Sequence, residues 1–215
     1  MPQPSGSFAA KIRFAIVCLM IEVKTFTGAN VAPHLDAVAA LRIAVFHDWP
    51  YLYAGDRDYE KNYLATYAKS PESLFVLAFD GERVIGASTG IPLTDETDPF
   101  QMPFSQRGIA LTDVFYLGES VLLKDYRGHG LGHRFFDERE GYARRLDRFR
   151  LTAFCAVERG ANDPRKPESF RPNDVFWNKR GYRRQDDMFC AIDWQEIGDT
   201  EPSTHRLRFW LRDLI

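Results

Sequence analysis

A run of alternating glycines, Gly128, Gly130 and Gly132, is the part of the sequence best suited to chemistry. Glycine lets the backbone approach a ligand closely, and the first amides of a helix have no partner within the helix. The helix dipole favours negative charge at the same end. Arg127 and His129 add basic groups inside the run. The stretch therefore predicts a cradle of backbone N–H groups for a phosphate or pyrophosphate.

Two other glycine motifs are excluded by their spacing. A P-loop requires GxxxxGK followed by Ser or Thr, and the chain has no such segment. The dinucleotide fingerprint requires GxGxxG in an opening βαβ unit, whereas the run here is GxGxG. A GxGxG run by itself is also compatible with a tight turn that has only a structural role.

Two segments taken together resemble the signatures of the GNAT acetyltransferase superfamily. Residues 127–132, Arg-Gly-His-Gly-Leu-Gly, match R/Q-x-x-G-x-G/A, the pyrophosphate motif of that family, and residues 120–126 resemble its strand-to-loop lead-in. Residues 176–182, Phe-Trp-Asn-Lys-Arg-Gly-Tyr, resemble its second signature, usually F-Y-x-x-x-G-F. The order of elements over residues 12–195 is similar as well. The pair of motifs is much more specific than either one alone.

The resemblance implies an α/β protein of the GNAT fold, with a mixed, mostly antiparallel and splayed central sheet flanked by helices. It implies acetyl-CoA as co-substrate, bound in a cleft between two parting strands, here 119–123 and 151–157. The first strand would bind the pantetheine arm and polarise the thioester carbonyl through a backbone N–H, and the glycine run would hold the pyrophosphate. The cofactor-binding residues implied in this way are Val121, Leu122, Leu123, Arg127, Gly128, His129, Gly130, Leu131 and Gly132.

The activity that the resemblance implies is acetyl transfer to an amine of a small molecule or peptide. Such an amine is protonated at neutral pH and must lose a proton before it attacks, and a carboxylate can accept that proton directly or through water. Glu119 is the candidate base, because it lies on the strand that leads into the glycine run and shares a face with Val121 and Leu123. A purely structural or exposed Glu119 is the alternative, and Asp113 is a weaker candidate base.

One position departs from the family pattern. Trp177 stands where many members have the tyrosine that protonates the leaving thiolate, and an indole is a poor acid. Tyr182 follows in the slot usually held by Phe, where core packing is the simpler interpretation. The departure leaves open an acyl-CoA-binding module without turnover, or an acyltransferase for a different acceptor or acyl chain.

The surrounding sequence predicts the elements that position these residues. Strands are expected over residues 12–26, 74–79, 83–91, 116–123, 151–157 and 188–194, with a hairpin turn at Asp80-Gly81. Helices are expected from Pro33, after Asp56, over 131–146 and over 175–179, with a last element at 207–214. Residues 92–110 are expected as a long connection whose Phe100, Met102 and Phe104 contribute to the acceptor side.

Composition is typical of one globular domain. A chain of 215 residues can bury a sizeable core without a metal or a disulfide. Residues 1–11 are expected to form a flexible N-terminal tail, and residues 12–215 a single acetyltransferase domain. The net charge of −2 argues against wide, non-specific binding of nucleic acid.

The cysteines and the apolar runs indicate the cellular compartment in which the protein is expected. Cys18, Cys155 and Cys190 are widely spaced and form no CxxC, so neither a disulfide framework nor a metal site is expected. The longest apolar run, 14–21, is too short to span a bilayer. We therefore expect a cytoplasmic protein without a membrane partner, whose partners are the amine acceptor and, as an open question, a second copy in a homodimer.

Overall fold

The computed structural model describes residues 21–160 and 162–214. Its strands are β1 (Ile21–Thr27), β2 (Leu74–Asp80), β3 (Arg83–Pro92), β4 (Val114–Tyr116), β5 (Ser120–Leu122), β6 (Leu151–Val157), β7 (Arg183–Trp194) and β8 (Ser203–Asp213). Its α-helices are α1 (Leu35–Phe46), α2 (Arg57–Lys69), α3 (Asp98–Ser105), α4 (Leu131–Arg145) and α5 (Asp174–Lys179). Short 3₁₀ turns lie at Gly28–His34, Leu93–Asp95, Leu111–Asp113 and Lys124–Tyr126.

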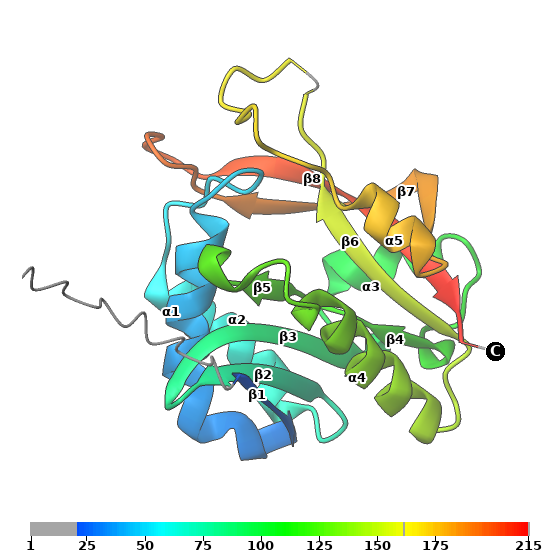
Figure 1. The fold of residues 1–215 in the computed structure, drawn as a ribbon. Helices are drawn as coiled ribbons and strands as arrows, with labels where there is room; N and C mark the ends of the chain where they lie inside the picture. Colours follow the sequence, from blue (N-terminus) through cyan, green and yellow to red (C-terminus); the bar gives the residue numbers. More distant parts are fainter. Residues whose placement is uncertain (1–20, 161, 215) are drawn as a thin grey trace, which may run out of the picture.

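The strands form one open sheet in the order β1-β2-β3-β4-β6-β8-β7, with β5 paired to β3 beyond β4. Every pairing is antiparallel except that of β4 with β6. Helices α1, α2 and α3 cover one face, and α4 and α5 cover the other (Figure 1). The predicted mixed, mostly antiparallel sheet flanked by helices is confirmed.

Local signals in the sequence explain most element boundaries. The Asp56 carboxylate accepts the amides of Asp58 and Tyr59 at 2.8 and 3.0 Å, so it caps the start of α2. The helix ends at Lys69 and Ser70 is extended, because the residue before a proline avoids the α region. The β2–β3 hairpin turns at Gly81, whose φ of 60° is a left-handed conformation.

The predicted continuous strand over residues 116–123 is wrong, because a bulge divides it into β4 and β5. The Thr89 carbonyl accepts a hydrogen bond from the Gly118 amide, and the Thr89 amide donates to the Glu119 carbonyl, both at 3.1 Å. Two residues, Gly118 and Glu119, therefore oppose Thr89 alone, which is the pattern of a β-bulge. A Cβ at Gly118 would lie only 2.6 Å from the Thr89 hydroxyl oxygen, and the close approach therefore requires glycine. The bulge turns the chain at the residue that the sequence singled out as a base.

The connection at residues 92–110 is also more ordered than expected, because it contains α3. Phe104 is fully buried with its ring 5.1 Å from that of Phe209, and Met102 is 55% exposed. Both side chains therefore lie away from the cavities described below, and only Phe100 of the three predicted acceptor residues lines one of them.

The N-terminal predictions are covered only in part. The strand expected over residues 12–26 corresponds to β1 from Ile21 onward, while 12–20, the tail 1–11 and the domain boundary between them lie outside the described residues. One helical stretch of the described chain, Gly28–Phe46, is long and apolar enough to cross a membrane by length and composition. A lone helix of this kind is weak evidence, and α1 buries Val38 and Leu41 in the core.

Candidate active site

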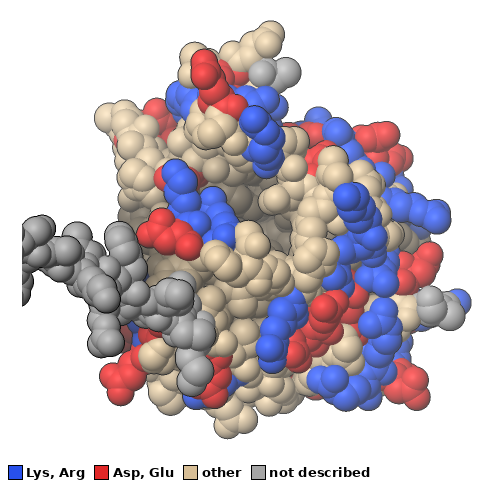
Figure 2. Space-filling view, in the orientation of Figure 1, with Lys and Arg blue, Asp and Glu red and all other residues tan. Residues whose placement is uncertain are grey.

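The sheet splits where β4 leaves β6. The amide of Leu117 donates to the carbonyl of Ala153 at 2.7 Å, and beyond this bond β5 follows β3 while β6 follows β8. A cavity of about 500 Å³ opens at the split. Figure 2 shows the surface hollowed on this face, with mostly uncharged walls and basic side chains on the rim.

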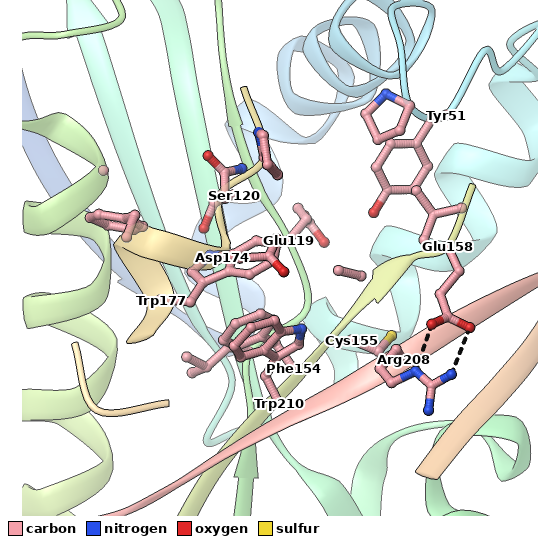
Figure 3. Close-up of a pocket in the computed structure, with 18 of the residues that line it drawn as sticks. Tyr51, Glu119, Ser120, Phe154, Cys155, Glu158, Asp174, Trp177, Arg208 and Trp210 are labelled. Atoms are coloured by element: carbon pink, nitrogen blue, oxygen red, sulfur yellow. Dashed lines mark hydrogen bonds and ion pairs between the residues drawn. The ribbon is translucent and has the colours of Figure 1, made fainter. Parts of the chain in front are cut away.

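Residues from both faces of the sheet line this cavity. On the α4–α5 face the rings of Phe154 and Trp177 lie 5.0 Å apart, and those of Trp177 and Trp210 lie 5.1 Å apart. Phe46 and Tyr51 line it from the α1 side. Figure 3 shows the three rings of the α5 side together and Tyr51 across the cavity from them. The cavity therefore has walls on both faces of the sheet.

Glu119 lies at the split and is 93% buried, with a relative exposure of 7%. Its Oε2 forms an ion pair with Nη1 of Arg42 at 2.7 Å and lies 3.1 Å from the hydroxyl oxygen of Tyr63. Its Oε1 is buried and accepts no hydrogen bond within the described residues. Glu119 also lines a second cavity of about 90 Å³ toward α1 and α2. Its carboxylate is therefore fixed by one oxygen, and the other oxygen has no hydrogen-bond partner among the described residues.

Arg42 holds two carboxylates together. Its guanidinium pairs with Glu60 through Nε as well as with Glu119, and its Cζ lies 4.1 Å from the ring centroid of Tyr63. Burial alone would lower the pKa of Arg42, but the two carboxylates raise it, so the group remains charged. Burial raises the pKa of Glu60 despite the arginine. This part of the site holds one cation and two carboxyl groups.

Two tyrosines connect Glu119 to a third buried carboxyl group. The hydroxyls of Tyr63 and Tyr67 lie 3.1 Å apart, and Tyr67 donates to Oε1 of Glu96 at 2.7 Å. Burial raises the pKa of Glu96, and the hydrogen bonds from Tyr67 and Thr97 oppose that rise. The chain of hydroxyls fixes the position of Tyr63 beside Glu119.

Arg139 of α4 anchors the bulge from the opposite face. Its Nη1 donates to the carbonyls of Thr89 and Glu119 at 3.2 and 3.0 Å, and its Nη2 donates to the Ser120 hydroxyl at 2.8 Å. The side chain is 2% exposed, and burial lowers its pKa to about 10. Arg139 thus holds the backbone of Glu119 through its carbonyl, independently of the Glu119 side chain.

The glycine run forms the turn that leads into α4. Gly128 and Gly130 have φ values of 85° and 81°, and an ideal Cβ at either would meet no atom within 4 Å beyond its chain neighbours. The surface beside both glycines is therefore open. Gly132 lies in the first turn of α4 and lines the large cavity. Nε of Arg127 donates to the Leu122 carbonyl at 3.1 Å, which joins the turn to β5.

The other predicted cofactor residues lie around this turn and strand. Leu122 lines the large cavity, whereas the amide of Leu123 donates to Ile85 at 3.0 Å and faces β3. Strand alternation directs the backbone groups of Val121 to the same edge as those of Leu123. The Leu131 side chain is buried in the core, and His129 Nδ1 lies 3.3 Å from the Tyr126 carbonyl.

Three further residues discussed from the sequence have distinct positions. Trp177 lines the large cavity. The Tyr182 hydroxyl lies 3.0 Å from Thr152 Oγ1 and donates to Glu140 at 3.2 Å, in the core rather than in the cavity. Asp113 lies in the 3₁₀ turn before β4 and lines neither cavity.

Sequence reasoning missed Arg42, Glu60 and Arg139. The available signal was a charged residue within an apolar helical face, since Arg42 follows Val38, and Arg139 follows Phe135, by one helical turn. Such positions predict burial with a partner, but their partners come from other elements and are distant in the sequence.

A family model shows what this architecture belongs to. The model described as the acetyltransferase (GNAT) family matches residues 40–166, more than half of the chain. The chain belongs to the GNAT acetyltransferase family. No curated protein sequence matches the chain.

Solved structures share the fold. A ribosomal-protein-alanine N-acetyltransferase from Brucella melitensis superposes with a TM-score of 0.55 at 13% identity, covering 89% of this chain and 99% of that one. An N-acetyltransferase from Staphylococcus aureus Mu50 gives a TM-score of 0.56 at 11% identity, covering 91% and 99%. The protein yncA from Salmonella typhimurium, solved with its cofactor acetyl-CoA, gives 0.53 at 12% identity, covering 91% and 94%. At these identities the likeness concerns the fold.

Metal ligands form no cluster in the described part of the chain. No group of three or more His, Cys, Asp or Glu side chains there could hold a metal ion. The thiols of Cys155 and Cys190 are free, and burial raises the pKa of Cys155 well above its usual range.

Proposed function

We propose that this protein transfers the acetyl group of acetyl-CoA to an amine, with Glu119 as the general base. The observation that carries the proposal is the Glu119 carboxylate at the split of the sheet, buried, held through Oε2 and without a partner at Oε1. It lines both cavities, so a ligand in either one meets it. Membership of the family supports acyl transfer as the reaction class.

The donor side would be the α4–α5 face of the cavity. Since the backbone of Leu123 pairs with β3, strand alternation directs the amide of Leu122 toward the split, where it can bind an extended amide-containing arm; the Leu122 carbonyl already accepts from Arg127. The open turn at Gly128 and Gly130, followed by the first amides of α4, suits a pyrophosphate. Acetyl-CoA supplies both groups, together with an acyl carbon activated as a thioester.

The proposed transfer releases one proton for each acetyl group moved. The acceptor enters as an ammonium ion and gives one proton to Oε1 of Glu119, which later releases it to solvent. The amine nitrogen then bonds to the thioester carbonyl carbon, the carbon–sulfur bond breaks, and the second nitrogen proton reaches the sulfur. The products are an amide, coenzyme A as its thiol, and one proton.

The leaving group does not require a tyrosine. A thiol has a pKa of roughly 8.5, so the departing sulfur is a stable anion compared with an alkoxide. Acetyl transfer is therefore possible with Trp177, rather than a tyrosine, in the cavity wall. The same residue is the reason to test for a binder of acyl-CoA without turnover.

The deciding experiment incubates the protein with acetyl-CoA and a panel of primary amines and measures thiol release. Release that depends on an amine, with the acetylated product seen by mass spectrometry, supports the proposal. Tight binding of acetyl-CoA without release for any amine would support the non-catalytic alternative.

Donor binding can be tested separately by calorimetry with coenzyme A. Gly130→Asp places a carboxylate in the open turn and should abolish binding. Gly198→Asp is the matched control, because Gly198 also has a positive φ, 91°, and open space around it, but lies in the β7–β8 turn. Equal affinities of the two variants would contradict the phosphate cradle.

A further inference from the structure

The smaller cavity has the chemistry of a pocket for the acceptor. It adjoins the large cavity at Gly118 and Glu119, which line both. Its walls are largely aromatic and include Phe46, Tyr51, Tyr53, Tyr63, Phe100 and Trp194. An amine placed against Glu119 would therefore direct the rest of its molecule among aromatic rings. Such walls favour an apolar body and also attract a cation through the ring faces.

The charged residues that line the smaller cavity favour binding of a cation, because carboxyl groups outnumber basic groups there. Arg42, Glu60 and Glu119 are the charged groups among the described residues that line it. Each of the two carboxyl groups has a buried Oε1 that accepts no hydrogen bond from the described residues. One guanidinium thus faces two carboxyl groups, each of which has an oxygen to spare.

Arg42 is already paired with both carboxyl groups, through Nε to Glu60 and through Nη1 to Glu119. It is 6% exposed, and its Cζ lies 4.1 and 5.0 Å from the ring centroids of Tyr63 and Phe46. A carboxylate on the acceptor would have only Nη2 of Arg42 to pair with, and the two glutamates already offset the charge of that guanidinium. Five further cations line the large cavity but not the smaller one: Arg139, Arg159, Lys166, Arg184 and Arg208.

We infer that the acceptor is a primary amine on an apolar or aromatic body that carries no carboxylate next to the amine. The inference rests on the proposed function and specifies its acceptor. An ammonium group would balance the charges that line the cavity, because it adds a second cation to one guanidinium and two carboxyl groups. It would also lie beside the two carboxyl oxygens that lack hydrogen-bond partners among the described residues. A neighbouring carboxylate would face Glu60 and Glu119 at close range, and like charges placed together are the usual means of rejecting a ligand.

Pairs of compounds that differ only in the carboxylate test this directly. Phenethylamine is compared with phenylalanine, and tyramine with tyrosine, through kcat/KM for thiol release from acetyl-CoA. The amine without the carboxylate should be preferred by roughly a hundredfold or more. Equal use of both compounds, or preference for the amino acid, would overturn the inference while leaving the acetyltransferase function intact.

Binding separates this inference from failure of the proposed function. Calorimetry with coenzyme A present measures the affinity of each compound without turnover. If thiol is not released but phenethylamine binds and phenylalanine does not, the pocket is assigned correctly and transfer is not. If neither compound binds, or both bind equally, the inference fails.

A charge variant provides the internal control. Glu60→Gln should reduce the preference for phenethylamine over phenylalanine about tenfold, because the lining then holds one cation and one carboxylate. Glu140→Gln is the matched control, since Glu140 is similarly buried but lines neither cavity. The Glu140 variant should retain the wild-type preference, and a similar change in both variants would contradict the role of Glu60.

Discussion

Two buried glutamates on opposite faces of the sheet have different surroundings. Glu140 of α4 is 3% exposed, and both its oxygens are bonded, to Arg180, Arg212 and the Tyr182 hydroxyl. Glu119 is 7% exposed, shares one arginine with Glu60, and has an oxygen without a partner among the described residues. The two side chains are similarly buried, but both oxygens of Glu140 are hydrogen-bonded and only one oxygen of Glu119 is.

The difference separates structure from function. A buried polar atom without a hydrogen bond costs free energy, so its presence requires an explanation. Glu140 has two arginines and a tyrosine, which is what a carboxylate needs to stabilise the packing of α4 against β8. Glu119 is instead held in position through one oxygen while the other has no partner among the described residues, which is consistent with its proposed role as the base.

Removing the shared cation should have the largest effect on stability. Arg42→Met leaves Glu60 and Glu119 buried without a counterion, and we expect a loss of about 3–5 kcal/mol in urea unfolding at pH 7. The pKa of Glu60, already raised by burial, should rise further. A carboxyl group whose pKa is higher in the folded state than in the unfolded state destabilises the fold as pH rises and the group loses its proton. The loss of unfolding free energy in the variant, relative to wild type, should therefore be smaller at pH 5 than at pH 8.

The matching change on the other face is Arg212→Met. Arg180 and Tyr182 remain bonded to Glu140 in that variant, so its loss should be only about 1 kcal/mol. Equal losses for the two variants would mean that the surroundings of the two glutamates do not differ energetically.

The two glutamates themselves should differ in catalysis. Glu119→Gln should lower kcat by at least roughly a hundredfold at pH 7 with the best amine found, while affinity for acetyl-CoA is kept. The deficit should shrink at high pH, where the amine deprotonates without help. Glu140→Gln should lower the melting temperature and leave kcat nearly unchanged. A rate loss confined to the Glu140 variant would reverse the comparison.

The anchor of the bulge should have an intermediate effect. Arg139→Lys cannot reach the Thr89 and Glu119 carbonyls and the Ser120 hydroxyl together, so we expect a loss of about 2 kcal/mol in unfolding free energy. Affinity for coenzyme A should also fall in calorimetry, because β5 shifts. Arg145→Lys, an exposed change on the same helix, serves as the control and should stay within about 0.5 kcal/mol of wild type.

The outer end of the tyrosine chain should have the smallest effect. Tyr67→Phe removes one hydrogen bond to Glu96, worth about 1 kcal/mol, or a fall of roughly 2–4 °C in Tm. That bond lowers the pKa of Glu96 against burial, so its loss raises the pKa further. The variant should therefore lose more stability relative to wild type as pH rises through the titration of Glu96. Tyr59→Phe, at a residue 41% exposed, should show no such trend.

The sequence anticipated the parts of this protein that depend on local chemistry. The Asp80-Gly81 hairpin and the capped α2 are encoded by a few neighbouring residues. The turn before α4 is encoded in the same way, because glycine at 128 and 130 permits the left-handed φ found there. Together with the motif at residues 176–182, these features were enough to identify the family and its sheet. Glu119 was selected as a candidate by its position on the strand alone.

Only the tertiary structure decided what surrounds Glu119. Arg42 and Tyr63 come from two helices distant in sequence, and Arg139 reaches the same bulge from the other face. The bulge itself depends on the close approach of Thr89 to Gly118, which no local pattern encodes. Local preferences fix a few dihedral angles at a time, whereas the pairing of buried charges depends on which elements pack together, and that is settled only when the whole sheet and its helices assemble.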